Sequence, residues 1–233
     1  MHRILDEPAY IIHARLFRDT SLLLDLLTLH HGRVSVLAKG VRRARSRWAG
    51  LLQPFVPLNI SYSGKSTLKI LSQAESLGAP LFFTGAHLYS ALYLNELLYK
   101  LLPHDDADEA IFDLYQNALQ SLTHESTEIV LRLFELRLLK HLGFGLSFQQ
   151  DATGLALQAD VFYEYWHEKG WCVAASHTLS KEVFSGEHLL AIGAENFCPT
   201  VLKEAKRIAR ILIQSLIGKP IMSRALFQRE VIS

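Results

Sequence analysis

The chain has 233 residues, of which 49% are hydrophobic and 20% charged, which is typical of one large or two small globular domains and excludes a disordered chain. The net charge of +1 hides an asymmetry, because residues 1–80 carry eleven Lys and Arg against five Asp and Glu, a net of +6, and the remainder carries a net of −5. This asymmetry indicates a polyanionic partner for the N-terminal part.

Neither a signal peptide nor a membrane span is predicted. Asp6 and Glu7 interrupt the N-terminal segment, so it lacks the apolar core of a signal peptide. The longest uncharged stretch, residues 76–95, contains glycine, proline and several polar residues, which favours a domain junction followed by a buried helix. The two cysteines, Cys172 and Cys198, form no CxxC pair, as expected for reduced thiols in the cytosol. We therefore expect a soluble, cytoplasmic protein without membrane contact.

The first eighty residues have the pattern of a small β-domain. Apolar runs cover 9–13 and 21–28, and within 34–39 the residues Val34, Val36 and Ala38 alternate with Ser35, Leu37 and Lys39. A further strand is predicted at 55–62, followed by a turn and its hairpin partner at 67–72. Five short strands in about 75 residues are typical of an OB-type barrel.

The hydrophobic period changes to that of helices after Gly85. Helices are predicted at 88–102, 108–122, 128–142 and 200–216, with a last short helix capped by Ser223. An irregular segment near 150–185 is expected to hold a hairpin over 161–176 that turns at Lys169-Gly170. The predicted fold class is α+β, with an N-terminal OB-fold β-barrel (1–80) and a mainly α-helical C-terminal domain (81–233).

The strongest functional feature is a run of basic residues without acidic neighbours. No acidic residue lies between Asp25 and Glu75, and the loop 41–48 reads VRRARSRW. Arginine offers phosphate a permanently charged, bidentate donor pair, so such a loop would follow a nucleic-acid backbone without reading bases. The alternative is a solvated charge run, but ordinary solvated faces mix both signs. The predicted DNA-binding residues are Arg33, Lys39, Arg42, Arg43, Arg45, Arg47, Lys65 and Lys69.

Two aromatic residues near this run have two possible roles. Trp48 and Tyr62 are the nearest candidates for stacking on bases. However, aromatic side chains supply much of the core of any small barrel, so we favour a core position for both.

No motif in the chain supports catalysis or metal binding. Gly64-Lys65-Ser66 resembles the end of a P-loop, but Asn59 stands where the first glycine is required. The spacing of His167, Cys172, His177 and Cys198 matches no compact zinc site. The acidic cluster at 105–109 is better explained as a helix start than as a cation site. We expect no catalytic residue, no metal and no cofactor.

Several segments, in order along nearly the whole chain, together resemble the RecO family of bacterial recombination mediators. They are TSLLLDLLTLHHGRVSVLAKGVRR (20–43), LLQPFVPLNISYSGKSTLKILSQAES (51–76), LYSALYLNELLYKLL (88–102), RLFELRLLKHLGFG (132–145) and SRALFQ (223–228).

The resemblance implies an OB-fold that binds single- and double-stranded DNA, a helical C-terminal domain and a nucleoid-associated location. It also implies annealing of complementary strands, even when coated by single-stranded-DNA-binding protein, and loading of RecA together with RecR. Members are not known as enzymes. Some carry a four-cysteine zinc site, but the corresponding region here, about 149–180, has only Cys172, so a zinc-free member is expected.

The resemblance further implies a docking site for the acidic, phenylalanine-ended tail of single-stranded-DNA-binding protein. Arg132 matches an arginine implicated in that site, and it would share one helix face with Leu136 and Leu139. Arg132 could instead form a surface pair with Glu128. A basic run on the predicted helix 200–216 could add to the positive potential for the acidic tail; its residues are Lys203, Lys206, Arg207 and Arg210.

Three other functions remain open at this point. Charge and fold alone also fit an RNA-binding OB-fold accessory protein, because phosphates are common to both nucleic acids. A nuclease would have to use the acidic cluster at 105–109, which lies in the helical part. A protein-interaction scaffold would use the basic loop to bind an acidic protein.

Overall fold

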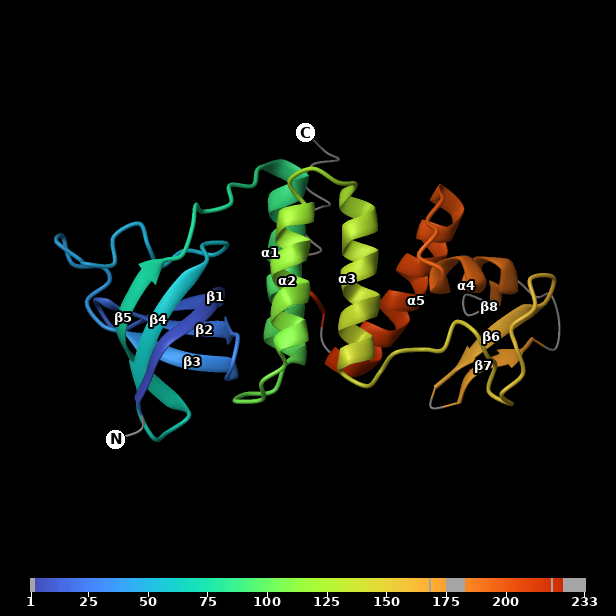
Figure 1. The fold of residues 1–233 in the computed structure, drawn as a ribbon, viewed down its shortest axis with the longest axis horizontal. Coiled ribbons are helices and arrows are strands. Elements are labelled where there is room, and N and C mark those ends of the chain that lie inside the picture. Colours follow the sequence, from blue (N-terminus) through green and yellow to red (C-terminus); the bar gives the residue numbers. More distant parts are fainter. Residues whose placement is uncertain (1–2, 168, 175–182, 219, 224–233) are drawn as a thin grey trace. The chain divides into compact units, whose positions relative to one another are not determined.

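The computed structural model describes residues 3–167, 169–174, 183–218 and 220–223. Two compact units form, one from residues 1–127 with 219–233 and one from residues 128–218. The predicted domain boundary at residue 80 does not coincide with this division and stays a prediction. Figure 1 shows the β-barrel of the first unit and the helices that follow it in the chain. The α+β class and the OB-like barrel are confirmed.

Five strands close the barrel in the order β1-β2-β3-β5-β4. They are β1 (Arg3–Phe17), β2 (Ser21–Thr28), β3 (Gly32–Ala38), β4 (Leu58–Ser63) and β5 (Leu68–Ser76). All neighbouring strands are antiparallel except β3 and β5, which run parallel. The second and third strands match the sequence prediction closely. The apolar run of β2 is buried from Leu23 to Thr28, and the side chains of β3 alternate between core and surface.

The first strand is longer than the predicted 9–13. Its polar beginning pairs with β4, from Arg3 opposite Ser63 to Ala9 opposite Leu58, with an irregularity between Ile4 and Glu7. A second irregularity between Ile11 and His13 shifts its register with β2. Such bulges bend a strand and allow it to pair with two neighbours around a closed barrel.

The barrel interior is filled by aliphatic side chains and two aromatic ones. Trp48, from the loop between β3 and β4, is 4% exposed, and Tyr62 of β4 is 1% exposed. The indole Nε1 of Trp48 donates a hydrogen bond to the Lys39 carbonyl oxygen at 3.1 Å. The preferred core position of both aromatic residues is therefore confirmed, and neither is a platform for bases.

Two helices complete the first unit, α1 (Gly85–Leu101) and α2 (Glu109–Ser121). From Leu88 onward no residue of α1 is exposed, as its nearly continuous apolar sequence predicted. Asn95 of α1 donates to the Ile11 carbonyl oxygen of β1 at 3.5 Å and accepts from the Tyr115 hydroxyl of α2 at 2.5 Å. Tyr10 of β1 packs edge-on against Tyr115, so both helices lie against the barrel's first strand.

The C-terminal segment returns to α1. The Glu96 carboxylate accepts hydrogen bonds from the backbone N–H groups of Met222 and Ser223 at 2.8 and 2.7 Å, and Lys100 donates to the Pro220 carbonyl oxygen. Burial alone would raise the pKa of Glu96, but the hydrogen bonds from Ser223, Met222 and Lys100 lower it overall. The predicted helix after Ser223 lies outside the described residues.

The second unit contains α3 (Thr127–His141), α4 (Gly186–Gly193), α5 (Pro199–Ile217) and a sheet in the order β7-β6-β8. The strands are β6 (Phe162–Trp166), β7 (Gly170–Val173) and β8 (Val183–Ser185). The predicted hairpin is confirmed as β6 and β7, although Gly170 pairs with Trp166 as the first residue of β7. Helix α5 ends at Gly218, whose φ of 61° suits a left-handed cap.

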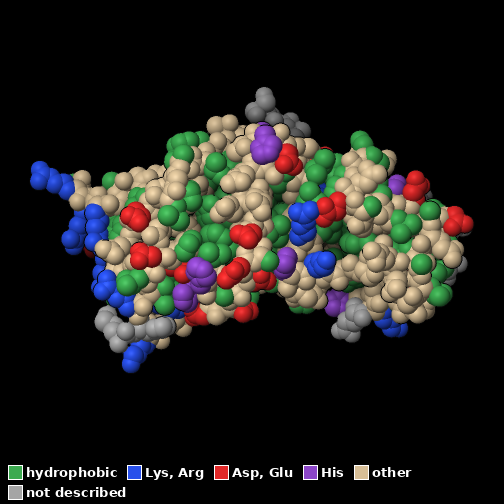
Figure 2. Space-filling view, in the orientation of Figure 1, with side chains coloured by type: hydrophobic (Ala, Val, Ile, Leu, Met, Phe, Trp, Pro, Cys, Tyr) green, Lys and Arg blue, Asp and Glu red, His purple; other side chains and the backbone are tan. Residues whose placement is uncertain are grey.

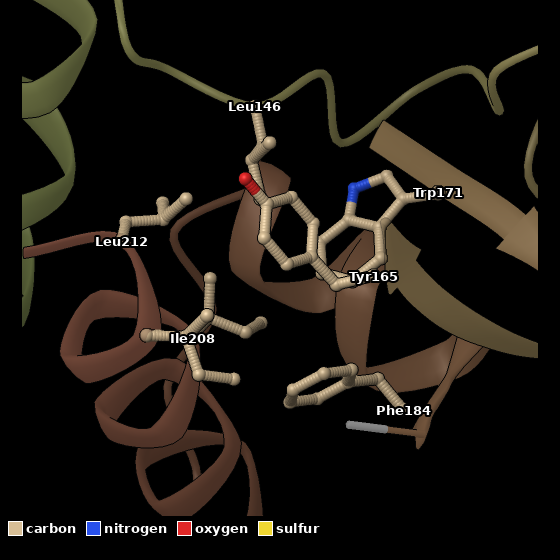
Figure 3. Close-up of a pocket in the computed structure, with 7 residues that line it drawn as sticks. Leu146, Tyr165, Trp171, Phe184, Ile208 and Leu212 are labelled. Carbon is tan, nitrogen blue, oxygen red and sulfur yellow. The ribbon is translucent and has the colours of Figure 1, made fainter. Parts of the chain in front are cut away.

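Aromatic side chains of the small sheet pack against α5. Figure 3 shows Tyr165, Trp171 and Phe184 converging with Ile208 and Leu212 of α5 around a shallow apolar depression. The depression has no room for a water molecule. It is therefore a core of the second unit and no ligand site. Among the described residues, no helix has both the length and the apolar character needed to cross a bilayer.

Candidate nucleic-acid interface

Most of the predicted DNA-binding residues lie on an exposed face of the barrel, which we call the basic face. Figure 2 shows Lys and Arg side chains gathered along the edge of the barrel away from α1 and α2. None of the residues of this face forms an ion pair within the described parts of the chain. The predicted members that are exposed are Lys39, Arg42, Arg43, Arg45, Arg47 and Lys65.

The loop after β3 is held in place by backbone hydrogen bonds. The backbone N–H of Arg42 donates to the Thr20 carbonyl oxygen at 3.1 Å, and its guanidinium donates to the Asp19 carbonyl oxygen at 3.3 Å. These bonds join the basic loop to the turn between β1 and β2. Gly40, with a φ of 71°, allows the sharp departure from β3.

The end of β1 and this turn add two cations that the sequence did not single out. Arg15 and Arg18 are exposed, and Arg18 lies beside the Phe17 ring at 5.4 Å. They were missed because they precede Asp25, where the acid-free interval begins. The β1–β2 hairpin, in which Phe17 pairs with Ser21, places Arg18 in the turn and Arg15 close to it. The hydrogen bond from Arg42 to Thr20 joins this turn to the basic loop.

Arg47 has a more ordered position than the other arginines of the loop. Its guanidinium lies 4.2 Å from the centre of the Trp48 ring and donates to the Ser72 carbonyl oxygen of β5 at 3.0 Å. Stacking and a hydrogen bond together fix the plane of this cation. Lys65 lies in the hairpin between β4 and β5, where Gly64-Lys65-Ser66 opens no helix.

Arg33 is not part of the basic face. Its Nη1 donates to the carbonyl oxygens of Tyr99 and Leu102 at 2.6 and 3.1 Å, at the C-terminal end of α1. Its Nη2 lies 3.4 Å from the buried carboxylate of Asp25, and its side chain is 12% exposed. The guanidinium therefore ties the barrel to α1 and has few donors left for a phosphate.

Lys69 is likewise used within the fold. Its Nζ pairs with the Asp105 carboxylate in the connection between α1 and α2, and the lysine side chain is 13% exposed. A phosphate would have to compete with this carboxylate. Both Arg33 and Lys69 thus lie where the helices cover the barrel, apart from the exposed loop.

The predicted tail-docking residues lie on α3. Arg132 is 7% exposed and its Nη2 donates to Glu135 at 2.9 Å, so it does not form the surface pair with Glu128 that was the alternative. Its Nε has no hydrogen-bond partner among the described residues. Leu139 is buried and Leu136 is half-buried.

The later basic run lies on α5. Lys203, Lys206 and Arg210 are exposed. Arg207 instead pairs with Glu204 at 2.7 Å and covers the Phe184 ring at 4.6 Å. Only the first three therefore present unpaired charge on the described surface.

The acidic cluster at 105–109 supports α2. The Asp108 side chain accepts hydrogen bonds from the backbone N–H groups of Ala110 and Ile111, so its interpretation as a helix start is confirmed. No group of three potential metal ligands occurs within the described residues, and His177 lies outside them. Cys172 and Cys198 are free thiols.

Comparison with known proteins identifies the family. Residues 1–80 match the model "Recombination protein O N terminal" and residues 83–225 match "Recombination protein O C terminal". The chain is 42% identical to a protein named DNA repair protein RecO from Coxiella burnetii (96% of this chain, 98% of the relative). It is 41% identical to the one from Photobacterium profundum (95% and 94%) and 42% identical to the one from Yersinia enterocolitica (97% and 95%). With both domains matched and nearly full-length relatives, this chain belongs to the RecO family of DNA repair proteins.

Proposed function

We propose that this protein binds single- and double-stranded DNA through the basic face, anneals complementary strands, and acts as a mediator rather than an enzyme. The observation that carries the proposal is the exposed loop whose four arginines, Arg42, Arg43, Arg45 and Arg47, lack carboxylate partners among the described residues. Arg15, near the end of β1, and Arg18, in the adjoining turn, would enlarge this face. Membership of a DNA repair family favours DNA over RNA as the nucleic acid.

Annealing follows from charge neutralisation. Two DNA strands repel one another through their phosphates, and a face that neutralises phosphates on both raises the local concentration of each strand. Base pairing then supplies the free energy, so neither a nucleotide cofactor nor a metal is required for this step.

The second unit would bring the protein to its substrate. We propose that Arg132, Leu136 and Leu139 contribute to a site for the acidic tail of single-stranded-DNA-binding protein. Arg132 would offer a carboxylate its Nε, the donor that the pair with Glu135 leaves unused among the described residues. Tethering to coated DNA would make the encounter of the barrel with that DNA intramolecular, so weak backbone contacts suffice. RecR would assist in loading RecA onto the strand.

The test is the salt dependence of binding to a single-stranded oligonucleotide. If about five phosphates are neutralised, the logarithm of the binding constant falls with the logarithm of salt concentration at a slope near −3.5. Reversing Arg42, Arg43 and Arg45 to glutamate makes the slope shallower by about 2, because three contacts are lost. The same variant should lose annealing of naked complementary strands.

A matched control reverses Lys203, Lys206 and Arg210 to glutamate, which changes the net charge equally on α5. This variant should keep the slope of the wild type. An equal loss of binding in both variants, or binding that is insensitive to salt, would contradict a defined basic face on the barrel.

A further inference from the structure

A polar groove lies beside the basic loop on the outer side of β4 and β5. Its volume is about 440 Å³, within the usual range of about 300–1,000 Å³ for small-molecule sites. Ser61 pairs with Gln73 and Asn59 with Glu75 across the two strands, so these four side chains share one face of the sheet. The groove is lined by Asp6, Arg47, Trp48, Asn59, Ser61, Gln73, Ala74 and Glu75.

One wall of the groove is a fixed planar cation. One face of the Arg47 guanidinium rests on Trp48 at 4.2 Å, and Nη2 is held by the Ser72 carbonyl oxygen at 3.0 Å. Trp48 is itself anchored in the core through its bond to Lys39. Arginine planes stack well on nucleobases, and a guanidinium that is already ordered loses little entropy on doing so.

Another part of the lining is acidic and amide-rich. The Asn59 Nδ2 donates to Asp6 at 3.4 Å and to Glu75 at 3.0 Å, using one oxygen of each carboxylate. The other oxygens, Asp6 Oδ2 and Glu75 Oε2, have no hydrogen-bond partner among the described residues. Two carboxylates repel a phosphate but accept hydrogen bonds from N–H groups, so this part of the lining suits the edge of a base and not the backbone.

We propose that this groove binds one unpaired nucleobase that carries an exocyclic amino group, stacked on Arg47 and donating to Glu75. This rests on the proposed function, because the basic loop delivers the strand to the groove. A base within a duplex uses its Watson–Crick edge for pairing, so only single strands can fill the site. Pairing with a complementary strand withdraws the base, and the groove therefore does not hold an annealed product.

The test compares 15-nucleotide oligo-dC, whose bases have an amino group, with oligo-dT, whose bases have none. We expect fluorescence anisotropy at pH 7.5 to show oligo-dC binding about fivefold tighter than oligo-dT. Glu75→Gln removes a negative charge, so electrostatics alone would tighten binding to both oligonucleotides equally. The groove instead predicts that the ratio of the two affinities falls toward one, and Gln73→Ala should lower it in part.

Two exposed residues of α2 provide matched controls, Glu109→Gln for the charge and Gln120→Ala for the side chain, and both should keep the wild-type ratio. A ratio of oligo-dC to oligo-dT affinity near one in the wild type, or a ratio that Glu75→Gln leaves unchanged, would contradict the proposed base site. A preference that disappears with a chelator would assign the groove to a cation instead. If neither oligonucleotide binds at low salt, the proposed function fails; salt-dependent binding with equal affinities removes only the base site.

Discussion

The two sides of the barrel show how similar cations acquire different roles. Arg33 lies under α1 and donates to two backbone carbonyl oxygens and a buried carboxylate. Arg43 and Arg45 lie in the loop after β3, exposed and without an ion pair among the described residues. All three belong to the same acid-free interval of the sequence. A cation is available to a ligand only when the fold has not already used its hydrogen-bond donors, and this is decided by distant residues.

Arg33→Ala should give the largest effect and would sharpen this comparison. The change leaves Asp25 buried with Ser35 and His13 as its remaining side-chain partners among the described residues, and it removes two bonds at the end of α1. Breaking a buried pair on one side costs about 3–5 kcal/mol of unfolding free energy. Urea unfolding followed by circular dichroism measures this loss of unfolding free energy.

Arg43→Ala is the matched control, because an exposed substitution changes stability by about 0.5 kcal/mol or less while DNA binding weakens. Equal destabilisation by the two changes would show that the two sides of the barrel do not differ in the way described.

Arg132→Ala should have the next largest effect. It leaves Glu135 buried without the guanidinium at 2.9 Å, and we expect a loss of about 3 kcal/mol of unfolding free energy. This is the lower end of the range for a broken buried pair, because Arg33 also loses two bonds to backbone carbonyl oxygens of α1 and its connection. If the proposed docking site is correct, binding of the acidic tail peptide also weakens by about tenfold or more, and binding of naked DNA is retained. Calorimetric titration of the folded variant with the peptide separates the two effects.

Arg132→Lys serves as the control because it keeps the charge but not the fork geometry. Peptide affinity that is unchanged in a folded Arg132→Ala variant would rule Arg132 out of the docking site and leave its pair with Glu135 as a purely structural contact.

The sequence predicted the parts of the fold that depend on local pattern. Strand β2 follows from its apolar run and β3 from alternation, α1 follows from its continuous apolar residues, and the end of α5 follows from Gly218. The core positions of Trp48 and Tyr62 followed from the need of a small barrel for bulky side chains.

Features that depend on tertiary contacts were not predictable. β8 has three residues and α4 has eight, too few for a period to emerge, and both were missed. The polar start of β1 pairs only because β4 lies beside it. The burial of Arg33 depends on Tyr99 and Leu102, more than sixty residues away, so no local pattern could separate it from Arg43.

Lys69→Ala should give the smallest effect. It tests whether a cation that is already paired within the fold takes part in DNA binding. Lys69 pairs with Asp105, whose side chain is 49% exposed, so water screens the pair and its loss costs only about 0.5 kcal/mol. Since the ammonium is already neutralised, the salt slope of DNA binding should stay within the error of the wild type, whereas Lys65→Ala should make it shallower by about 0.7. A slope that changes equally for both lysines would mean that DNA displaces Asp105, and that the basic face extends beneath the connection between α1 and α2.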